Sequence, residues 1–472
     1  MSHKLDARVW WTFAITSIAL FMVTLDNLVV TTAIPVIRRD LHAGLSGLEW
    51  TVNAYTLTFA VLLLTGAALG DRFGRRRLFT IGLVIFTLGS AAAALAPSIG
   101  VLDAARAVQG LGGAIVMPLT LTILSAGVPA EKRGVFLGAW GGISGLAVAF
   151  GPLVGGAVVN GLSWHWVFWL NVPIGLVLAP LALRRLDEST GPFGRVDVGG
   201  LVLGSAGLFG IVWGLVRANS LGWGSPEILG ALVAGAALLV GFVLWELRTE
   251  QPMLPMRFFG NRTFALANVA SLLMSFGMFG SIFLLAQFFQ TVQGYSPLGS
   301  GLRILPWTAM PMIVAPIAGA LSDRIAPSRI IGTGLALQAV GLAWIAAVST
   351  PTTSYTDLVL PFAISGMGMG MFFAPIANVV LSSVRNVEEG QASGANNAIR
   401  ELGGVFGVAV LASVFAHYGG YHTGTTFVNG MTPAVYIGAA VVAVGSLAAF
   451  AITRRPRRTE ALELEPALET AA

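Results

Sequence analysis

Fourteen long apolar segments run through this chain of 472 residues and constrain its fold more than any other feature. A helix that crosses a lipid bilayer needs about 20 mainly apolar residues. We therefore predict an all-α polytopic membrane protein with 14 transmembrane helices and both termini on one side of the membrane. The segments lie near residues 9–36, 47–69, 78–96, 100–124, 134–158, 166–184, 198–217, 228–247, 263–290, 303–321, 330–349, 357–382, 396–416 and 433–453.

The composition supports a membrane location. Only 10% of the residues are charged, whereas a soluble domain carries roughly 25%, so most of the surface must face lipid. The first segment is too long for the core of a signal peptide, and we expect it to remain as a spanning helix. The absence of cysteine excludes disulfides and thiolate metal sites, and the five scattered histidines suggest no metal ligands.

The basic residues predict an orientation. Of the 27 Lys and Arg residues, 21 fall in segments that share the side of the termini, four fall on the other side, and Arg106 and Arg400 fall within helices. Positive residues concentrate in cytoplasmic loops, so we place both termini in the cytoplasm and the protein in the cytoplasmic (inner) membrane. This asymmetry also explains the pI of about 10.0, and we expect no nucleic-acid partner.

The chain contains an internal repeat. Residues 68–77 read ALGDRFGRRR and residues 320–329 read ALSDRIAPSR, and both follow an even-numbered helix on the predicted cytoplasmic side. Transporters are commonly built from such repeats. We predict an N-terminal six-helix bundle (1–186), two inserted helices with their linkers (187–260), a C-terminal six-helix bundle (261–453) and a cytoplasmic tail (454–472).

The first copy of the repeated loop has the features of a gate. Its glycines permit a tight turn between two helices, and Asp71 is suited to accept hydrogen bonds from the exposed amides that begin the next helix. The arginines can pair with acids on neighbouring helices, or they merely enforce topology; the recurrence of Asp-Arg in the second copy favours a gate. We assign the cytoplasmic gate to Gly70, Asp71, Arg72, Gly74, Arg75, Arg76, Asp323 and Arg324.

An ordered set of motifs extends this interpretation over nearly the whole chain. They are LDNLVVTTAIP (25–35), GDRFGRRR (70–77), RAVQGLGGA (106–114), GPLVGG (151–156), WHWVFWLNVPIG (164–175), QGYSPLGSGL (293–302) and GQASGANNAIRELGGVFG (390–407). With them the sequence resembles the major facilitator superfamily, and within it the fourteen-helix drug:proton antiporters. The GPLVGG motif marks exporters in that family, so the resemblance implies outward transport. Asp103 departs from the family pattern, which has an apolar residue at that position.

Three buried charges are candidates for proton coupling. Asp26 lies deep in the first segment, where a carboxylate costs roughly 2.5–3.5 kcal/mol and should face a cavity or a partner. Arg106 can tune a neighbouring carboxylate or can pair with Asp103, three residues earlier. Glu401 is either a second proton site or a salt bridge with Arg400. Because Asp26 alone lacks a cationic partner nearby in sequence, we expect it to be the free carboxylate of the cavity.

The segment 134–158 carries the residues expected to move. Gly151, Gly155 and Gly156 let helix backbones approach closely, and Pro152 loosens the local hydrogen bonding. Two packings of similar energy, as alternating access requires, are one interpretation; ordinary close packing is the other.

Several soft or polar side chains are candidates for the wall of a substrate cavity, because methionine and phenylalanine adapt to varied apolar ligands. Core packing or lipid contact remains the alternative for many of them. The candidates are Met274, Phe279, Phe283, Gln287, Gln290, Met367, Met371, Phe372 and Asn378.

Together these features predict proton-coupled efflux of lipophilic, neutral or singly cationic drugs or antibiotics by a monomer. GMGMG (366–370) and GLGG (110–113) lie inside apolar helices rather than after strands, so we expect no nucleotide, no cofactor and an ion gradient as the energy source. A dedicated exporter of one endogenous metabolite or self-made antibiotic remains open. A membrane-embedded enzyme is disfavoured, since no paired embedded carboxylates or His-acid cluster occur in one bundle.

Overall fold

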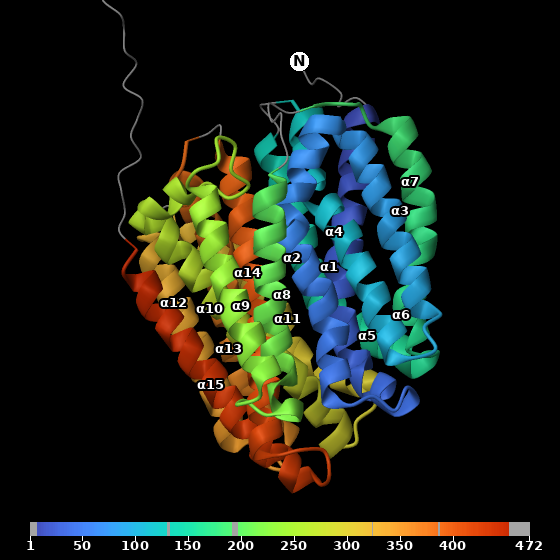
Figure 1. The fold of residues 1–472 in the computed structure, drawn as a ribbon. Coiled ribbons are helices and arrows are strands. Elements are labelled where there is room, and N and C mark those ends of the chain that lie inside the picture. The colour runs from blue at the N-terminus through green and yellow to red at the C-terminus, as the bar shows by residue number, and fades with distance from the viewer. Residues whose placement is uncertain (1–6, 130–132, 191–196, 323, 386–387, 453–472) are drawn as a thin grey trace, which may run out of the picture.

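The structure is a computed structural model that describes residues 7–129, 133–190, 197–322, 324–385 and 388–452, and these residues contain helices and no strands (Figure 1). A helix satisfies its own backbone hydrogen bonds, which lipid cannot do. The elements are α1 (Ala7–Asp40), α2 (Leu45–Phe73), α3 (Arg75–Ala94), α4 (Ile99–Gly127), α5 (Arg133–Gly161), α6 (His165–Trp169), α7 (Asn171–Arg185), α8 (Val198–Leu221), α9 (Pro226–Glu246), the 3₁₀ turn η2 (Met256–Gly260), α10 (Arg262–Gln287), the π-helical turn η3 (Phe288–Val292), α11 (Pro297–Leu321), α12 (Pro327–Val348), α13 (Tyr355–Ser382), α14 (Glu389–Tyr418) and α15 (Gly424–Phe450).

Every predicted apolar segment coincides with one of these helices, and the sixth with the pair α6 and α7. Within the described residues, 12 helical stretches are long and apolar enough to cross a membrane, and the bent helix α2 makes 13. The segment predicted at 134–158 coincides with α5. An all-α polytopic membrane protein is therefore confirmed. Asp323 and the tail at 454–472 lie outside the described residues.

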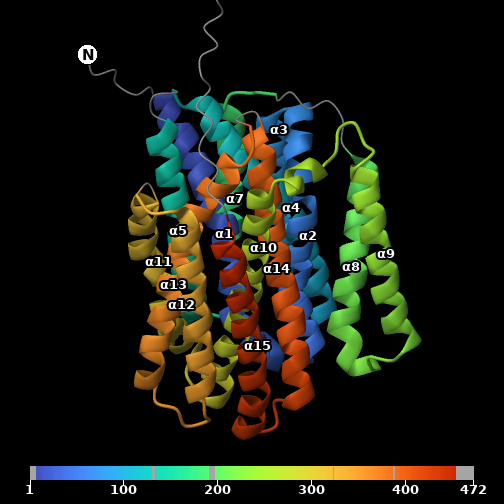
Figure 2. The ribbon, with the colours of Figure 1, turned by 90° about the vertical axis from the view of Figure 1, so that its left-hand side faces the viewer.

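The helices form two groups with a hairpin beside them (Figure 2). In the first group, α4 packs against α1, α2 and α3, and α5 packs against α1. In the second group, α10 packs against α14 and α15, while α13 packs against α11 and α12. Helix α8 of the hairpin α8–α9 packs against α2 and α14. The predicted divisions after residues 186 and 260 both fall between spanning helices.

Two seams join the groups. Helix α2 of the first group packs against α14 of the second, and α5 packs against α11. The seam helices carry Glu401 on α14 and the glycines of the GPLVGG motif on α5, whereas Asp26 and Arg106 lie on α1 and α4 within the first group.

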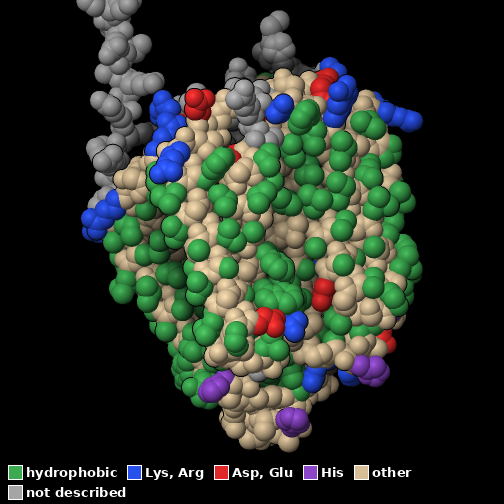
Figure 3. Space-filling model, viewed as in Figure 1, with side chains coloured by type: hydrophobic (Ala, Val, Ile, Leu, Met, Phe, Trp, Pro, Cys, Tyr) green, Lys and Arg blue, Asp and Glu red, His purple; other side chains and the backbone are tan. Residues whose placement is uncertain are grey.

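Basic side chains gather at one end of the molecule, which we call the basic end (Figure 3). There α1 begins, α2 ends and the loop at 70–77 lies (Figure 1). The arginines predicted to face the other side lie near the end of α1, near the end of α8 and near the start of α11, at the opposite end; they are Arg38, Arg39, Arg217 and Arg303.

Candidate transport site

A buried ion pair lies at the centre of the first helix group. Arg106 Nη1 of α4 donates to Asp26 Oδ2 of α1 over 2.5 Å, and the side chains are 1% and 0% exposed. Removing two charges from water is costly unless they are paired and hydrogen-bonded. The pair corrects two expectations: Asp26 is not a free carboxylate, and Arg106 pairs with Asp26 rather than with Asp103.

Amide side chains complete the hydrogen bonds of this pair. Gln109 Nε2 and Asn171 Nδ2 both donate to Asp26 Oδ1, at 2.8 and 2.7 Å. Gln109 Oε1 also accepts from Arg106 Nη1 at 2.7 Å. Asp26 thus accepts hydrogen bonds from three donors on α4 and α7. The sequence analysis missed both amides, although Gln109 lies in the RAVQGLGGA motif and Asn171 in WHWVFWLNVPIG.

Asp103 has a separate partner. Its Oδ1 accepts from Thr51 Oγ1 of α2 at 2.9 Å, whereas Arg106 Nε donates to the Thr51 carbonyl at 3.1 Å. The side-chain pair three residues apart that the sequence suggested is replaced by contacts to a neighbouring helix. Asp103 therefore ties α4 to α2.

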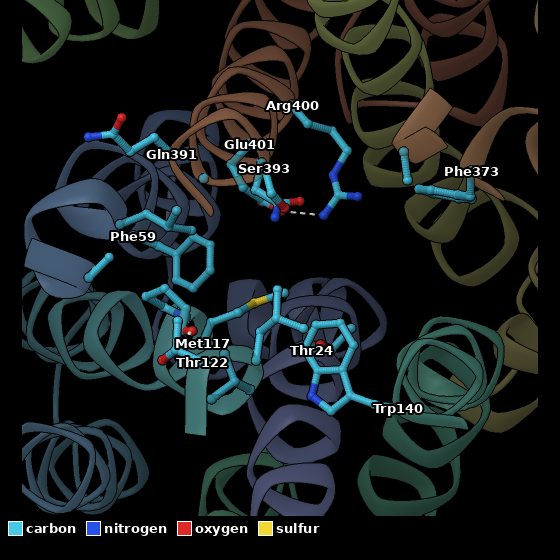
Figure 4. A pocket seen from close by; sticks show the side chains of 18 of the residues that line it. Thr24, Phe59, Met117, Thr122, Trp140, Phe373, Gln391, Ser393, Arg400 and Glu401 are labelled. Atoms are coloured by element: carbon cyan, nitrogen blue, oxygen red, sulfur yellow. Dashed lines mark hydrogen bonds and ion pairs between the residues drawn. The ribbon is translucent and has the colours of Figure 1, made fainter. Parts of the chain in front are cut away.

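A cavity of about 1910 Å³ lies between the two helix groups. It reaches the basic end, where its wall includes Asp71, Arg75 and Glu388, and its interior wall includes Phe59, Met117 and Trp140. Phe59, Met117 and Trp140 come from α2, α4 and α5, while Phe373 and Glu401 come from α13 and α14 across the space (Figure 4). Most of the wall is apolar, as sites for drug-sized ligands are.

Two charges lie on the inner wall of this cavity. Glu401 Oε1 is 3.6 Å from Arg400 Nη2, and Glu401 Oε2 accepts from Asn27 Nδ2 at 3.4 Å. Arg400 also lies over the Phe373 ring, with Cζ 5.6 Å from its centroid. Asp26 is absent from the cavity lining that the structure describes. Among the described residues, the acid on the inner wall of the cavity is therefore Glu401, whereas Asp71 and Glu388 border the cavity at the basic end.

Tyr55 lies between the hidden ion pair and the cavity. Its ring centroid is 4.2 Å from Arg106 Cζ, and the residue also lines the cavity. The hydroxyl donates to the Val23 carbonyl at 3.3 Å, and the ring stacks on Phe59 at 5.9 Å between centroids. The Tyr55 ring therefore contacts both Arg106 and the cavity.

The predicted cavity residues are largely misplaced. Phe279 and Asn378 line the cavity. The other seven do not line it. Met274, Phe283, Gln287 and Phe372 are buried, Met367 is 38% exposed, Met371 is partly buried, and Gln290 donates to the Thr32 carbonyl at 2.8 Å. Helical spacing does not reveal which face turns inward when a helix is apolar on all sides.

The loop at 70–77 is a tight turn held by a residue distant in sequence. Gly74 has φ of 105°, a left-handed conformation that glycine adopts readily, and its N–H closes α2 on the Gly70 carbonyl. Glu188 Oε1 accepts from the Arg76 amide at 2.9 Å, so Glu188 caps α3. Asp71, expected to do so, instead accepts from Arg75 Nε at 2.7 Å.

The remaining gate residues differ in their contacts. Arg76 Nε lies 3.6 Å from Glu188 Oε2, which fulfils the expected pairing of an arginine with an acid of a neighbouring segment. Arg72 lies over its neighbour Phe73, with Cζ 5.1 Å from the ring centroid. Arg324 is exposed, and its amide bonds the Leu321 carbonyl at 3.0 Å.

The glycines of α5 lie in close contact with α1 on one side and with α11 on the other. A methyl group at Gly151 or Gly155 would meet α1, at 2.6 Å from Leu28 Cβ and 2.4 Å from Thr32 Oγ1. A methyl group at Gly156 would lie 2.4 Å from the Pro297 carbonyl of α11. The Pro152 carbonyl in turn faces α11, 2.2 Å from where a Cβ of Gly301 would stand. Both helix groups therefore touch the same two turns of α5.

Polar contacts close the opposite end of the molecule. Arg38 Cζ of α1 lies 3.4 Å from the ring centroid of Tyr421, in the loop before α15. Burial raises the pKa of the Tyr421 hydroxyl, which remains neutral and donates to Gln287 Oε1 at 2.6 Å. With the α5–α11 contact and the bond from Gln290 to Thr32, these interactions separate the cavity from the opposite end.

Comparison with known proteins identifies the family. A profile described as Major Facilitator Superfamily matches residues 16–408 and also residues 307–470. The chain belongs to the major facilitator superfamily.

Two curated relatives match most of the chain. It is 34% identical over 417 residues to the tetracenomycin C resistance and export protein of Streptomyces glaucescens, covering 87% of this chain and 77% of the relative. It is 35% identical over 407 residues to the multidrug resistance protein Stp of Mycobacterium tuberculosis, covering 86% and 75%. The fold matches a solved POT-family peptide transporter with a TM-score of 0.70 at 14% identity, covering 96% and 98%.

Proposed function

We propose that this major facilitator protein exports lipophilic small molecules from the cytoplasm in exchange for protons. The observation that carries the proposal is the cavity of about 1910 Å³, apolar over most of its wall, which reaches the basic end and is closed at the opposite end. Loops rich in Lys and Arg face the cytoplasm, so a cargo enters this conformation from inside the cell. The names of the relatives, which refer to antibiotic resistance and export, support the direction.

Adjacent residues on α1 give a route for coupling. Asn27 contacts Glu401 of the second helix group, and Asp26, its neighbour in the chain, pairs with Arg106 in the first. We assign proton exchange with the cavity to Glu401. A proton that neutralises Glu401 weakens its attraction to Arg400 and Asn27, which frees α1 to shift relative to α14.

The ion pair supplies the second step. A proton delivered to Asp26 from the opposite side removes the charge that holds Arg106, because a neutral carboxyl no longer balances the guanidinium. Arg106 then moves against the Tyr55 ring on the cavity wall, and the cargo site changes shape. In this scheme Asp26, Arg106 and Glu401 couple protons to cargo, and none of them breaks a covalent bond of the cargo.

The wall charges indicate which cargo fits. Glu401 and Arg400 balance one another on the inner wall, and Glu401 is the acid that a cation can approach there. We infer neutral or singly cationic lipophilic cargo, since a second buried positive charge would lack a partner. Exchange of one proton for one monovalent cation moves no net charge, whereas neutral cargo also responds to a potential worth about 2.3 kcal/mol per charge per 100 mV.

We further propose that the protein works as a monomer without a cofactor and catalyses no reaction. Each helix group contributes one side of the same cavity, so a single chain forms the whole path. The energy then comes from the proton gradient alone.

Efflux of a monovalent lipophilic dye from loaded cells tests this function. Cells that make the protein should expel the dye faster than cells without it, and an uncoupler should abolish the difference. Efflux that persists with the uncoupler would indicate a facilitator instead.

A dedicated exporter of one compound is the second candidate, because the tetracenomycin C relative is named for a single antibiotic. A panel of structurally unrelated monovalent and neutral dyes separates the two. Export of several unrelated dyes indicates a broad exporter, and export of none with retained transport of one antibiotic indicates a dedicated exporter.

A further inference from the structure

The hairpin α8–α9 carries two carboxyl groups at its base, outside the transport site proposed above. Asp197 precedes α8, and its Oδ1 accepts from the Gly200 amide at 2.7 Å and from Trp245 Nε1 at 2.8 Å. Glu246 ends α9, and its Oε2 accepts from the Leu254 amide at 3.0 Å. One oxygen of each carboxyl group is therefore occupied by donors from the hairpin and its linker.

The other two oxygens lie beside Gly200 and have no donor. Asp197 Oδ2 and Glu246 Oε1 are buried and accept no hydrogen bond, and Glu246 is only 3% exposed. A Cβ at Gly200 would stand 2.6 Å from the first oxygen and 2.5 Å from the second, so both border one small gap. The two side chains are within hydrogen-bonding reach of one another.

Two ionised carboxylates cannot face each other at such a distance without compensation. Each accepts hydrogen bonds but donates none, and like charges this close do not both ionise. One proton in the gap converts the repulsion into a short, charge-assisted hydrogen bond. A single proton fits the geometry, because the gap joins one oxygen from each carboxyl group and every other oxygen of the pair already has a donor.

We propose that Asp197 and Glu246 bind one exchangeable proton between them, in a site distinct from Asp26 and Glu401. Both residues line the mouth of the large cavity, which gives the proton a path to water. The inference does not depend on the direction of transport or on the nature of the cargo.

The shared proton fixes the linker that crosses the cavity mouth. Residues 247–257, here called the strap, follow Glu246, and most of them line the cavity. The bond from the Leu254 amide to Glu246 folds the strap back against the end of α9. Next to it, Met253 Sδ accepts from Thr65 of α2 at 3.3 Å, and at the end of the strap Arg257 pairs with Glu388.

Loss of the proton leaves two facing negative charges at the base of the hairpin. The strap adds a third acid, Glu250, on the same mouth, while Arg257 is already paired with Glu388. On the elements packed against the hairpin, Asp71 of α2 is paired with Arg75, and Glu401 of α14 lies near Arg400. Within the described residues neither Asp197 nor Glu246 forms an ion pair, and Arg248 of the strap is exposed, so the new charge makes Glu246 separate from Asp197 and the strap loses its anchor.

Infrared spectroscopy of the full chain reconstituted in lipid tests the proposal. At neutral pH the wild type should show a carboxylic-acid C=O band that Asp197→Asn and Glu246→Gln each remove, because an amide donates to the remaining carboxylate. The spectrum of the double variant should lack this band and no other carboxylic-acid band. Glu250→Gln is the matched control and should keep it. A band that survives in both single variants would overturn the proposal.

Two further measurements keep the test decisive. The band should be equal in sodium and in choline buffer; a band that disappears on adding sodium would show a metal cation in the gap instead of a proton. If a single variant does not accumulate, the double variant takes its place, because its two amides can form a hydrogen bond across the gap.

In the wild type, loss of the band on raising the pH should coincide with faster amide hydrogen exchange at 247–257, corrected for intrinsic rates. Unchanged exchange would contradict the role of the strap.

Discussion

Asn27 Nδ2 lies 3.4 Å from Glu401 Oε2, so the residue that follows Asp26 in the chain contacts the acid of the other helix group. Asp26 itself points away from the cavity, and its Oδ2 accepts from Arg106 Nη1 at 2.5 Å. Neighbouring residues of a helix point about 100° apart, which lets one turn of α1 touch both sites. A shift of α1 therefore changes both contacts together.

Asp26→Asn should abolish proton-driven efflux and lower the thermal stability of the purified protein. The variant keeps a hydrogen-bonding side chain but leaves Arg106 as an unbalanced buried charge, which costs about 3–5 kcal/mol. Asp103→Asn is the matched control, because the Asp103 side chain accepts a hydrogen bond from Thr51 and lies outside the ion pair, so its loss should have a smaller effect. Efflux and melting temperature measure both. Wild-type efflux in Asp26→Asn would exclude a coupling role.

Glu401→Gln should reduce transport of a monovalent cationic dye by tenfold or more while a neutral substrate is affected less. Loss of a charge-assisted contact of about 1.4 kcal/mol corresponds to that factor. The amide retains the size of the side chain and its contact with Asn27. Initial rates for both substrates in proteoliposomes check the difference. Equal losses for the two would show that Glu401 couples protons without touching the cation.

Gly156→Ala should arrest transport by keeping α5 and α11 apart. The added methyl group would lie 2.4 Å from the Pro297 carbonyl, and overpacking of this kind costs typically 1–3 kcal/mol. Gly161→Ala, in the same helix, has no atom within 4 Å of the added group and should transport normally. Efflux from cells with equal protein levels compares the two. Activity equal to wild type in Gly156→Ala would contradict a role for this seam.

Glu188→Gln should slow turnover more than it weakens cargo binding. Glu188 caps α3 and pairs with Arg76 at the basic end, away from the inner cavity wall. Asp71→Asn should act in the same direction, since it removes the partner of Arg75. Transport rates and dye-binding affinities separate the two effects. A collapse of affinity with unchanged turnover per bound cargo would exclude the gate assignment.

Acid should destabilise the contact between the strap and the α13–α14 loop. The hydrogen bond from Arg385 lowers the pKa of Glu388. A carboxyl whose folded pKa lies below its unfolded pKa adds stability above the unfolded pKa and loses it as the pH falls through the folded value. The melting temperature should therefore fall more steeply between neutral pH and pH 3 in the wild type than in Glu388→Gln. Parallel slopes would show that Glu388 contributes no pH-dependent stability.

The sequence alone predicts the helices well and the site only in part. Runs of about 20 apolar residues locate α1 or α13 without any tertiary information. The sequence does not reveal the partner of Asp26, because Arg106 lies 80 positions away and only helix packing brings the two side chains together. The sequence also does not identify most of the cavity residues. Met274 and Phe283 lie on α10, which is apolar around most of its surface, so the sequence pattern does not show which face of the helix meets the cavity.

Transport in proteoliposomes tests proton-coupled export most directly. The pH difference and the membrane potential are set independently, and uptake of a monovalent cationic dye is followed together with the internal pH. We predict that at zero potential a pH difference alone drives dye accumulation with countermovement of protons, that Asp26→Asn abolishes it, and that a divalent dye of similar size is transported poorly. Dye movement that ignores the pH difference, with no proton flux, would contradict the account.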